Sequence, residues 1–495
     1  AATKIKSYEN YFSQSGYGYG ERIALLLGNS VEHYLVKLAA NNLGISVVPL
    51  NPDSSKSEII YILNDSNSVL LITNKNHSQL ASSVKDKLET SILIVNIEEF
   101  SKSLPASKTP IQKVVVTHNS EASLLYTSGT TGKPKGCILS HEYELMCGDS
   151  YRSAGPPVGL KVNQDRVYNP LPSFHINAGI LTLFGCILTG NCLIQPARFS
   201  SNNWWIDIKE TQATVFHYLG VIISVLLQNE KTSDIKPNSL RLGLGAGVEP
   251  TLHQSFEKKY KIPLIEVWGM TEMCRILTAN EEPRMIHTRA MGKPRLDLEI
   301  KIVDDNDKDV PIGTEGEMLV RYSAESPRKG AFSGYLGNEN ETENAWRGGW
   351  FHTGDTVVMD SRNILYFVDR KKNIIRRSGE NIAAAEIENC MMEHSSVLEV
   401  ACLAAPDDIR EEEVLACIVL RKNKLSNHKT AKTLFNHVYN RLAYFKAPGW
   451  ILFVEKLPIT GTQKILKHNI FEKNENPLER PGIIDLRKLK IRKTI

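Results

Sequence analysis

The sequence lacks the cysteine patterns that mark zinc sites. Its eight cysteines form no CxxC pair and have no histidine spacing suited to zinc, and most stand among apolar residues. Such cysteines are typical of reduced core residues, which indicates a reducing compartment. The N-terminal run AATKIKSYENYF has no apolar core and no cleavage signal, so no secretory signal is visible. We therefore expect a cytoplasmic protein.

The chain also has little net charge. Its 59 lysines and arginines nearly balance its 55 acidic residues, which gives +4 at pH 7. This balance argues against nucleic acid or an anionic membrane as a partner. Residues 176–194 carry no charge over about nineteen positions, near the length that crosses a bilayer. Glycines and polar residues interrupt this stretch, so we expect a buried core element rather than a membrane span.

Apolar runs alternate with helix-period segments from residue 22 onward. With 495 residues, of which 42% are hydrophobic, the chain can bury more than one core. The alternation predicts a mostly parallel sheet flanked by helices, within a layered α/β domain. The expected strands are 22–27, 46–52, 68–73 and 91–97, and the expected helices are 30–44 and 57–67. Strand and helix signals repeat over residues 166–268.

The pattern changes twice nearer the C-terminus. Alternating runs at 298–305, 316–322 and 364–370 predict an antiparallel subdomain on the first domain. A basic stretch follows Asp369, and after it comes a new α+β pattern. We predict a large domain over residues 1–369, a hinge at 370–375 and a small α+β domain at 376–495.

Residues 124–136 read LLYTSGTTGKPKG and predict a site for a polyphosphate. Glycines permit positive φ and close backbone approach, so successive N–H groups can turn toward an anion. Hydroxyl groups add hydrogen-bond donors, and lysines add compact positive charge. The candidate phosphate-binding residues are Thr127, Ser128, Gly129, Thr130, Thr131, Gly132, Lys133 and Lys135.

Two alternatives exist for this loop. A P-loop of the form GxxxxGK[ST] needs a hydroxyl residue after the lysine, and Pro134 follows Lys133 here. A flexible surface loop is the other alternative, which the ordered run of residue types disfavours. The run YTSGTTGKPKG resembles the phosphate loop of the adenylate-forming superfamily, which contains acyl-CoA synthetases, adenylation domains of peptide synthetases and beetle luciferases.

This resemblance implies an N-terminal AMP-binding domain and a mobile C-terminal lid domain. It also implies that the protein uses ATP and coenzyme A as cosubstrates and Mg²⁺ as a cofactor. The elements around residues 21–27 begin early compared with that superfamily, so we expect a truncated or divergent start.

The run VWGMTEM at 267–273 carries the second motif. A hard cation that bridges phosphates needs one or two protein oxygens. In the superfamily, the residues that match Thr130 and Glu272 hold magnesium. Trp268 stands where that family usually has tyrosine, at the adenine pocket. The resemblance adds four residues to the predicted nucleotide site: Trp268, Gly269, Met270 and Thr271.

Two further runs match nucleotide contacts of the superfamily. In GLGAGVEP at 243–250, small residues let backbone lie close to a flat ring, and the matching positions Gly245, Ala246 and Gly247 border adenine and the acyl group. In WFHTGD, Asp355 matches the ribose-binding aspartate, because a carboxylate accepts two hydrogen bonds from vicinal hydroxyls. Arg370 matches an arginine that reaches the nucleotide.

The run LPITGTQKIL at 457–466 contains the candidate catalytic lysine, Lys464. A mobile point charge there would stabilise negative charge between the substrate carboxylate and the α-phosphate. The run resembles the pattern LPxTxxGKIxR, although Gln463 replaces glycine and Lys467 replaces arginine. The resemblance further implies rotation of the small domain about Lys372, which withdraws Lys464 and brings the Gly379 segment to the acyl-adenylate.

The substrate acid is indicated less directly. His175, in LPSFHINAG, matches a gate at the acyl pocket, and PSFHI lacks the aspartate that amino-acid adenylating domains carry there. Phrases such as ARFSSNNWW resemble crotonobetaine or carnitine CoA-ligases. Trp204, Trp205 and Tyr218 are candidates to hold a quaternary ammonium, unless both tryptophans pack in the core. The predicted acyl and CoA pocket comprises His175, Tyr218, Gly220, Gly245 and Gly379.

We predict an ATP-dependent acid–thiol ligase that forms an acyl-adenylate, releases pyrophosphate and transfers the acyl group to coenzyme A. Its catalytic residues are predicted to be Thr130, His175, Glu272 and Lys464. The alternatives are a ligase for short, medium-chain or aryl acids, a carrier-protein loader, a luciferase-like oxidase and a catalytically dead nucleotide-binding protein. The expected partners are a small carboxylic acid and coenzyme A. The sequence leaves open whether the protein forms a homodimer.

Overall fold

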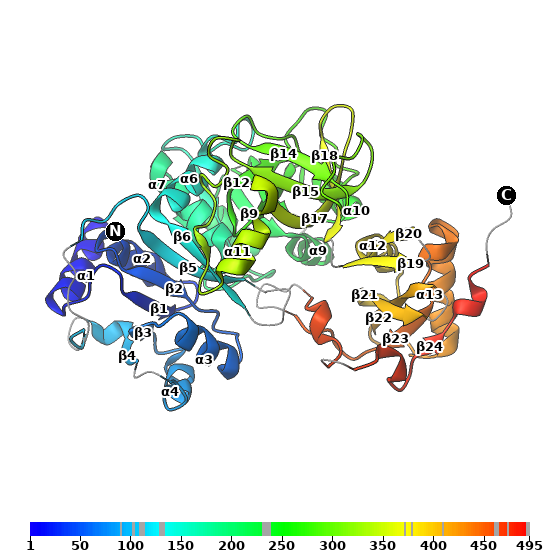
Figure 1. Cartoon of the computed structure of the whole chain (residues 1–495), viewed down its shortest axis with the longest axis horizontal. Helices are drawn as coiled ribbons and strands as arrows, with labels where there is room; N and C mark the ends of the chain where they lie inside the picture. Colours follow the sequence, from blue (N-terminus) through cyan, green and yellow to red (C-terminus); the bar gives the residue numbers. More distant parts are fainter. Residues whose placement is uncertain are drawn as a thin grey trace. The chain divides into compact units, whose positions relative to one another are not determined.

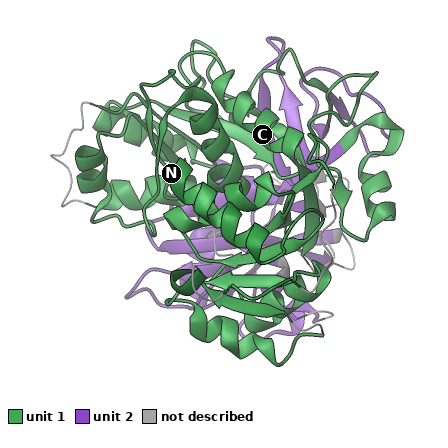
Figure 2. Ribbon diagram, turned by 90° about the vertical axis from the view of Figure 1, so that its left-hand side faces the viewer, with its two compact units in different colours: residues 1–300, 320–351 green, residues 301–319, 352–495 purple. Residues whose placement is uncertain are grey.

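The structure is a computed structural model of the whole chain. It describes residues 1–89, 92–100, 104–107, 114–127, 134–229, 239–370, 373–377, 380–407, 410–459, 465–472 and 475–491. The chain divides into two compact units, residues 1–300 with 320–351 and residues 301–319 with 352–495 (Figure 2). The domain boundaries expected from the sequence, with a hinge at 370–375, stay a prediction.

The first sheet of unit 1 follows the order β16-β6-β5-β2-β1-β3-β4. Its members from β5 to β4 pair in parallel, whereas β6 pairs antiparallel with β5 and β16 pairs antiparallel with β6. The strands are β1 Arg22–Leu26, β2 Ser46–Pro49, β3 Leu70–Thr73, β4 Leu93–Asn96, β5 Glu121–Thr127, β6 Lys135–Ser140 and β16 Gly334–Tyr335.

Helices cover both faces of this sheet because its buried strands are apolar on both sides. Ile23 and Leu25 of β1 pack with α1 (Ala2–Gln14) and α2 (Val31–Asn42). Ala24 and Leu26 point to the other face, where α3 (Lys56–Asp65) and α4 (Ser78–Lys85) pack. Figure 1 shows the two helix pairs on opposite sides of the sheet. The predicted layered, mostly parallel α/β fold is confirmed.

The second sheet of unit 1 follows the order β12-β11-β10-β9-β7-β8. Its aromatic core lies under three helices, α8 (Trp204–Thr211), α9 (Gly220–Gln228) and α10 (Pro250–Tyr260). The strands are β7 Arg166–Tyr168, β8 Cys192–Ile194, β9 Val215–Leu219, β10 Leu242–Ala246, β11 Leu264–Met270 and β12 Met273–Thr278. Other elements of this unit are η1 Ile97–Glu99, α6 His141–Arg152, β13 Ala290–Gly292, α11 Glu339–Ala345 and η4 Arg347–Gly349.

The uncharged stretch 176–194 forms short elements rather than one long helix. A π-helical segment, η2 (Asn177–Thr182), leads into α7 (Leu183–Thr189) and then into β8. Most side chains of η2 and α7 are buried, and α7 packs against α6. Among the residues that the structure describes, no helix combines the length and apolar character needed to span a membrane.

Unit 2 contains antiparallel strands and a separate α+β sheet. Both kinds of structure were predicted from the sequence, which assigned the antiparallel strands to the first domain. The first group follows the order β18-β17-β15-β14, with bounds β14 Glu299–Val303, β15 Gly316–Arg321, β17 Phe351–Met359 and β18 Leu365–Arg370. The second follows β20-β19-β22-β23-β24, with β21 beside β22. Its strands are β19 Ile374–Arg377, β20 Glu380–Ala383, β21 Val397–Asp407, β22 Glu411–Leu420, β23 Trp450–Phe453 and β24 Ile484–Asp485.

Helices α12 (Ala384–Met392) and α13 (His428–Arg441) bury one face of this second sheet. A smaller apolar cluster around Trp450 and Leu452 covers the other face. Single helical turns complete the fold at η6 Tyr444–Lys446, η7 Lys467–Asn469, η8 Pro477–Glu479 and η9 Arg487–Leu489.

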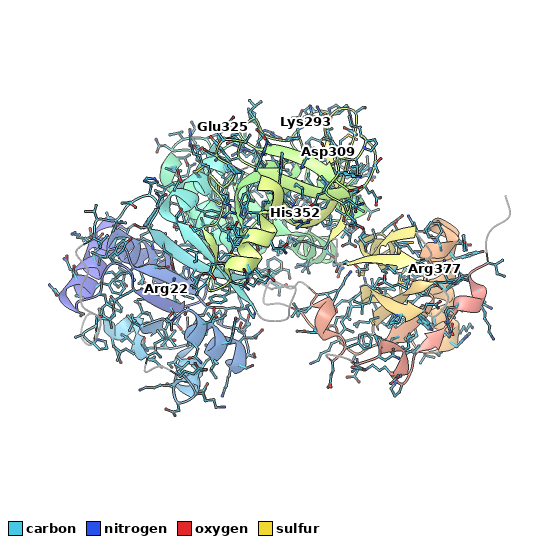
Figure 3. All side chains as sticks on the ribbon, viewed as in Figure 1. Arg22, Lys293, Asp309, Glu325, His352 and Arg377 are labelled. Carbon is cyan, nitrogen blue, oxygen red and sulfur yellow. The ribbon has the colours of Figure 1, made fainter. Side chains whose placement is uncertain are left out.

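A buried ionic cluster fixes the C-terminal segment to this sheet. Arg377, which is labelled in Figure 3, places its Nε 2.7 Å from an oxygen of Glu413. Lys490 places its Nζ 2.5 Å from the other oxygen of Glu413 and donates to the carbonyl of Phe445 at 2.9 Å. Glu413 has no exposed surface, and each of its two carboxylate oxygens has a cationic partner that replaces water.

A second buried ion pair connects the helices around β5 in unit 1. The Lys37 ammonium of α2 lies 2.6 Å from a carboxylate oxygen of Glu144 on α6. Both side chains are nearly inaccessible, at 3% and 1% exposure. Ser123 of β5 bonds to both groups, with its Oγ 2.5 Å from the Lys37 Nζ and 2.6 Å from the Glu144 oxygen. Two helices and strand β5 are therefore linked by one polar cluster.

Replacing one partner of this pair should destabilise the chain strongly. Lys37→Met leaves a buried carboxylate without its cation, and we expect a loss of about 3–5 kcal/mol in the free energy of unfolding. The double variant with Glu144→Met removes both charges and should recover most of that loss. Urea unfolding of the full chain measures both values, and a double variant as unstable as Lys37→Met would contradict the assignment.

Candidate active site

The ends of β5 and β6 fix the borders of the predicted phosphate loop. Thr127 is the last residue of β5, Lys135 is the first of β6, and the two are cross-strand partners. The loop therefore connects two antiparallel strands. The remaining phosphate-loop candidates lie outside the described residues: Ser128, Gly129, Thr130, Thr131, Gly132 and Lys133.

Lys135 lies in a polar environment formed by β16 and α11. Its ammonium forms an ion pair with the Glu341 carboxylate. The same nitrogen lies 5.2 Å from the ring centroid of Tyr335, within the range of a cation–π contact. These contacts fix the position of a positive charge at the exit of the loop.

Glu272 lies in the tight turn between β11 and β12, as the motif predicts. The residue is 8% exposed, and one carboxylate oxygen accepts a hydrogen bond of 3.0 Å from the Tyr335 hydroxyl. The preceding residue, Thr271, is fixed through its carbonyl, which accepts from the Tyr143 hydroxyl at 2.8 Å. A carboxylate is a hard oxygen donor, so its chemistry fits magnesium. The fold thus brings Glu272 to the same tyrosine as Lys135.

The glycine-rich turn after β10 is packed tightly by the protein itself. A Cβ on Gly245 would lie 2.2 Å from the Tyr218 carbonyl oxygen, and one on Gly220 would lie 1.9 Å from the Gly247 oxygen. Gly247 adopts a φ of +75°, which disfavours a side chain. The small residues are therefore required by contacts between β9, β10 and α9, in addition to any role toward a bound ring. Ala246 ends β10 beside them.

Glu266, which the motif analysis did not select, contacts this turn. Its carboxylate accepts a hydrogen bond of 2.6 Å from the Tyr218 hydroxyl and one of 2.8 Å from the Gly247 N–H. Burial raises the pKa of Glu266 to about 7, and the Tyr218 hydrogen bond opposes the shift. A carboxyl group that titrates near neutrality thus lies among the predicted adenine and acyl residues.

Trp268 and His175 have different surroundings. Trp268 lies on β11, pairs with Leu277 of β12 and is 6% exposed. Gly269 and Met270 complete that strand. His175 packs beside Phe174 with ring centroids 4.8 Å apart, and burial lowers its pKa to about 4. The imidazole is therefore neutral at pH 7.

The aromatic candidates for a quaternary ammonium are packed in the core. Trp204 and Trp205 are fully buried. The Trp204 ring makes edge contacts with Phe216 and Tyr168, and the Trp205 ring lies 4.7 Å from that of Tyr260. This arrangement favours the alternative in which both tryptophans pack in the core and do not hold a quaternary ammonium. Tyr218 is also fully buried.

In unit 2, Asp355 and Arg370 are cross-strand partners on β17 and β18. The Nε of Arg370 lies 2.6 Å from an Asp355 oxygen, and Asp355 is 1% exposed. An ordinary surface ion pair would leave the aspartate in water, whereas here the carboxylate is held within the sheet. The two residues assigned to the nucleotide are therefore adjacent.

The remaining C-terminal candidates, Lys372, Gly379 and Lys464, lie outside the described residues. Their neighbour Lys467 is described, and its Nζ lies 2.7 Å from an oxygen of Glu388 on α12. Burial raises the pKa of Glu388, while Lys467 opposes that shift. The lysine that replaces the expected arginine thus anchors the segment that follows Lys464.

Comparison with protein families identifies the chain. The sequence model of the AMP-binding enzyme family matches residues 3–336. The sequence model of the AMP-binding enzyme C-terminal domain matches residues 386–464. The chain belongs to the AMP-binding enzyme family. The predicted membership of the adenylate-forming superfamily is thereby confirmed.

Curated relatives and solved structures agree with this family. The chain is 26% identical to a crotonobetaine/carnitine–CoA ligase of Proteus mirabilis over 94% of this chain and 91% of that protein. It is 29% identical to the mitochondrial acyl-coenzyme A synthetase ACSM3 of Mus musculus, over 92% and 80%. The o-succinylbenzoate CoA synthetase of Bacillus subtilis, solved with its acyl-adenylate intermediate, superposes with a TM-score of 0.82 at 26% identity, covering 96% and 93%.

The predicted enzyme class, an AMP-forming acyl-CoA ligase, is confirmed by these matches, and so is the use of ATP, Mg²⁺ and coenzyme A. The roles of single residues, the cytoplasmic location and the homodimer stay predictions.

Tyr335, Glu341 and Glu266 are the site residues that sequence reasoning missed. Glu266 stands directly before VWGMTEM, and this position next to the motif could have indicated that Glu266 belongs to the site. Tyr335 and Glu341 follow a run without a recognised pattern, and their contacts depend on pairing between β16 and β6.

The pKa of Glu266 predicts a pH-dependent contribution to stability. The carboxyl ionises near 4.5 when unfolded and near 7 when folded, so the unfolded state binds fewer protons between these values. This residue's contribution to stability should therefore fall as pH rises from 4.5 to 7. In urea unfolding at pH 5 and pH 7.5, the difference between wild type and Glu266→Gln should shrink or reverse at the higher pH; parallel profiles would refute this prediction.

Proposed function

We propose that this ligase activates a small carboxylic acid, with carnitine or crotonobetaine as the first candidates. The buried Glu272 carboxylate, placed at the border of the phosphate loop through Tyr335 and Lys135, is the observation that carries the adenylation step. In that step the acid's carboxylate attacks the α-phosphate of ATP, which releases pyrophosphate and forms the acyl-adenylate. The thiol of coenzyme A then displaces AMP.

Each group has a distinct role in this proposal. Thr130 and Glu272 hold Mg²⁺, which offsets negative charge on the phosphates. The loop residues Thr127 to Lys135 bind the phosphate oxygens through backbone N–H groups, hydroxyls and lysines. Asp355 accepts hydrogen bonds from the ribose hydroxyls, and its ion pair with Arg370 orients the carboxylate. No nucleophilic side chain is required.

Lys464 stabilises the charge that develops between the carboxylate and the α-phosphate. After adenylation, rotation about Lys372 withdraws Lys464 and brings the Gly379 segment to the acyl-adenylate for attack by the thiol. The Lys467–Glu388 ion pair supports this proposal because it fixes the C-terminal side of the Lys464 segment to α12.

The acyl pocket is proposed to involve His175, Tyr218, Gly220 and Gly245. The relatives that act on carnitine compounds support a quaternary ammonium acid. The complete burial of Trp204 and Trp205 favours a second candidate, a short, medium-chain or aryl acid, because core side chains pack against both rings. The neutral state of His175 suits an uncharged acyl chain.

A carboxylate panel tests the proposal. Purified protein with ATP, Mg²⁺ and coenzyme A is offered carnitine, crotonobetaine, butyrate, octanoate and benzoate, and thioester formation and pyrophosphate exchange are measured separately. We expect one acid to give both signals. Exchange with benzoate or octanoate alone would favour the second candidate, and no exchange with any acid would contradict adenylation.

A substitution at the proposed hinge should separate the two half-reactions. Proline fixes φ near −65°, so Lys372→Pro should restrict the rotation needed for thioester formation. We expect pyrophosphate release close to that of wild type and thioester formation at least about tenfold slower. Lys372→Ala, which leaves the backbone free, serves as the matched control. Equal loss of both half-reactions in Lys372→Pro would count against the hinge.

A further inference from the structure

Residues 332–336 connect the exit of the phosphate loop to the Glu272 turn. The Phe332 N–H donates to the Glu272 carbonyl at 3.0 Å, whereas the Leu336 N–H donates to the Gly136 carbonyl at 2.8 Å. Between them, Tyr335 is the cross-strand partner of Cys137 on β6. One short segment therefore bonds to both halves of the proposed magnesium and phosphate site.

The Tyr335 side chain makes the same connection. Its hydroxyl donates to the Glu272 carboxylate at 3.0 Å, and its ring face lies 5.2 Å from the Lys135 ammonium. The ring also packs against Phe332, with centroids 4.7 Å apart. Backbone pairing and ring packing together leave the hydroxyl little freedom to turn away from the carboxylate.

We propose that Tyr335 is a positioning residue for the magnesium ligand Glu272. The hydrogen bond holds one carboxylate oxygen in place, so less rotational entropy is lost when the carboxylate binds a cation. This inference rests on the role proposed for Glu272.

The chemistry of the two groups fixes the direction of this hydrogen bond. A phenol carries an O–H donor, whereas the oxygens of a carboxylate accept. The Tyr335 hydroxyl therefore donates to the Glu272 oxygen, which is a hard donor for a cation.

Tyr335→Phe tests the proposal because it removes the hydroxyl and keeps the ring. Binding of Mn²⁺ in the presence of ATP is titrated by electron paramagnetic resonance on the full chain, and the Mg²⁺ dependence of pyrophosphate exchange is measured in parallel. Fixing a glutamate side chain before the cation binds is worth about tenfold in affinity. We expect Mn²⁺ binding about tenfold weaker and a similar rise in the Mg²⁺ concentration that gives half-maximal exchange.

Tyr168→Phe is the matched control. The Tyr168 hydroxyl donates to Asp207 at 2.9 Å, and this buried tyrosine packs in the second sheet. Its loss should leave Mn²⁺ affinity unchanged, and thermal unfolding shows whether either variant loses structure. Tyr335→Met, which lacks ring and hydroxyl, should bind Mn²⁺ at least as weakly as Tyr335→Phe.

Glu272→Gln tests the metal role of Glu272 separately from the positioning role of Tyr335. If it weakens Mn²⁺ binding while Tyr335→Phe and Tyr335→Met bind Mn²⁺ as wild type does, the positioning role is refuted and the proposed metal site stands. If Glu272→Gln binds Mn²⁺ as wild type does, the metal role proposed for Glu272 fails, and the inference about Tyr335 fails with it.

Discussion

The buried contact of Lys37, Glu144 and Ser123 is the interaction on which the first unit depends. It places opposite charges where water cannot reach them, so each group needs the other. Because Ser123 belongs to β5, the contact ties α2 and α6 to the strand that ends at the proposed phosphate loop. If that loop binds a polyanion as proposed, this buried polar contact holds the strand from which the loop starts.

The proposed site uses pairing between strands to place residues that are distant in sequence. Asp355 and Arg370 become neighbours because β17 and β18 pair in register. In the other unit, Tyr335 reaches Lys135 and Glu272 because β16 joins the edge of the first sheet. In both cases backbone hydrogen bonds fix the positions of these residues before a ligand binds. Less conformational entropy is then lost on binding.

Local signals in the sequence were sufficient for much of the fold and for the family. Helix α2 has a serine cap and helix α3 a complete capping box, and short β-branched runs gave the strands around them. Glu272 and Asp355 stood inside recognisable runs. The packing of Trp204 in the core was one of two alternatives that the sequence left open. The contact of Tyr335 with Glu272 could not be predicted, because it depends on which distant strands meet. The close approach of Gly220 to Gly247 is likewise a tertiary property.

The Glu413 cluster gives the end of the chain a structural importance that its basic composition conceals. Lys490 is the second cation beside a carboxylate that has no access to solvent. Loss of Lys490 would leave Glu413 with Arg377 alone in the interior of the sheet. The segment around η9 is therefore part of the folded core of this unit.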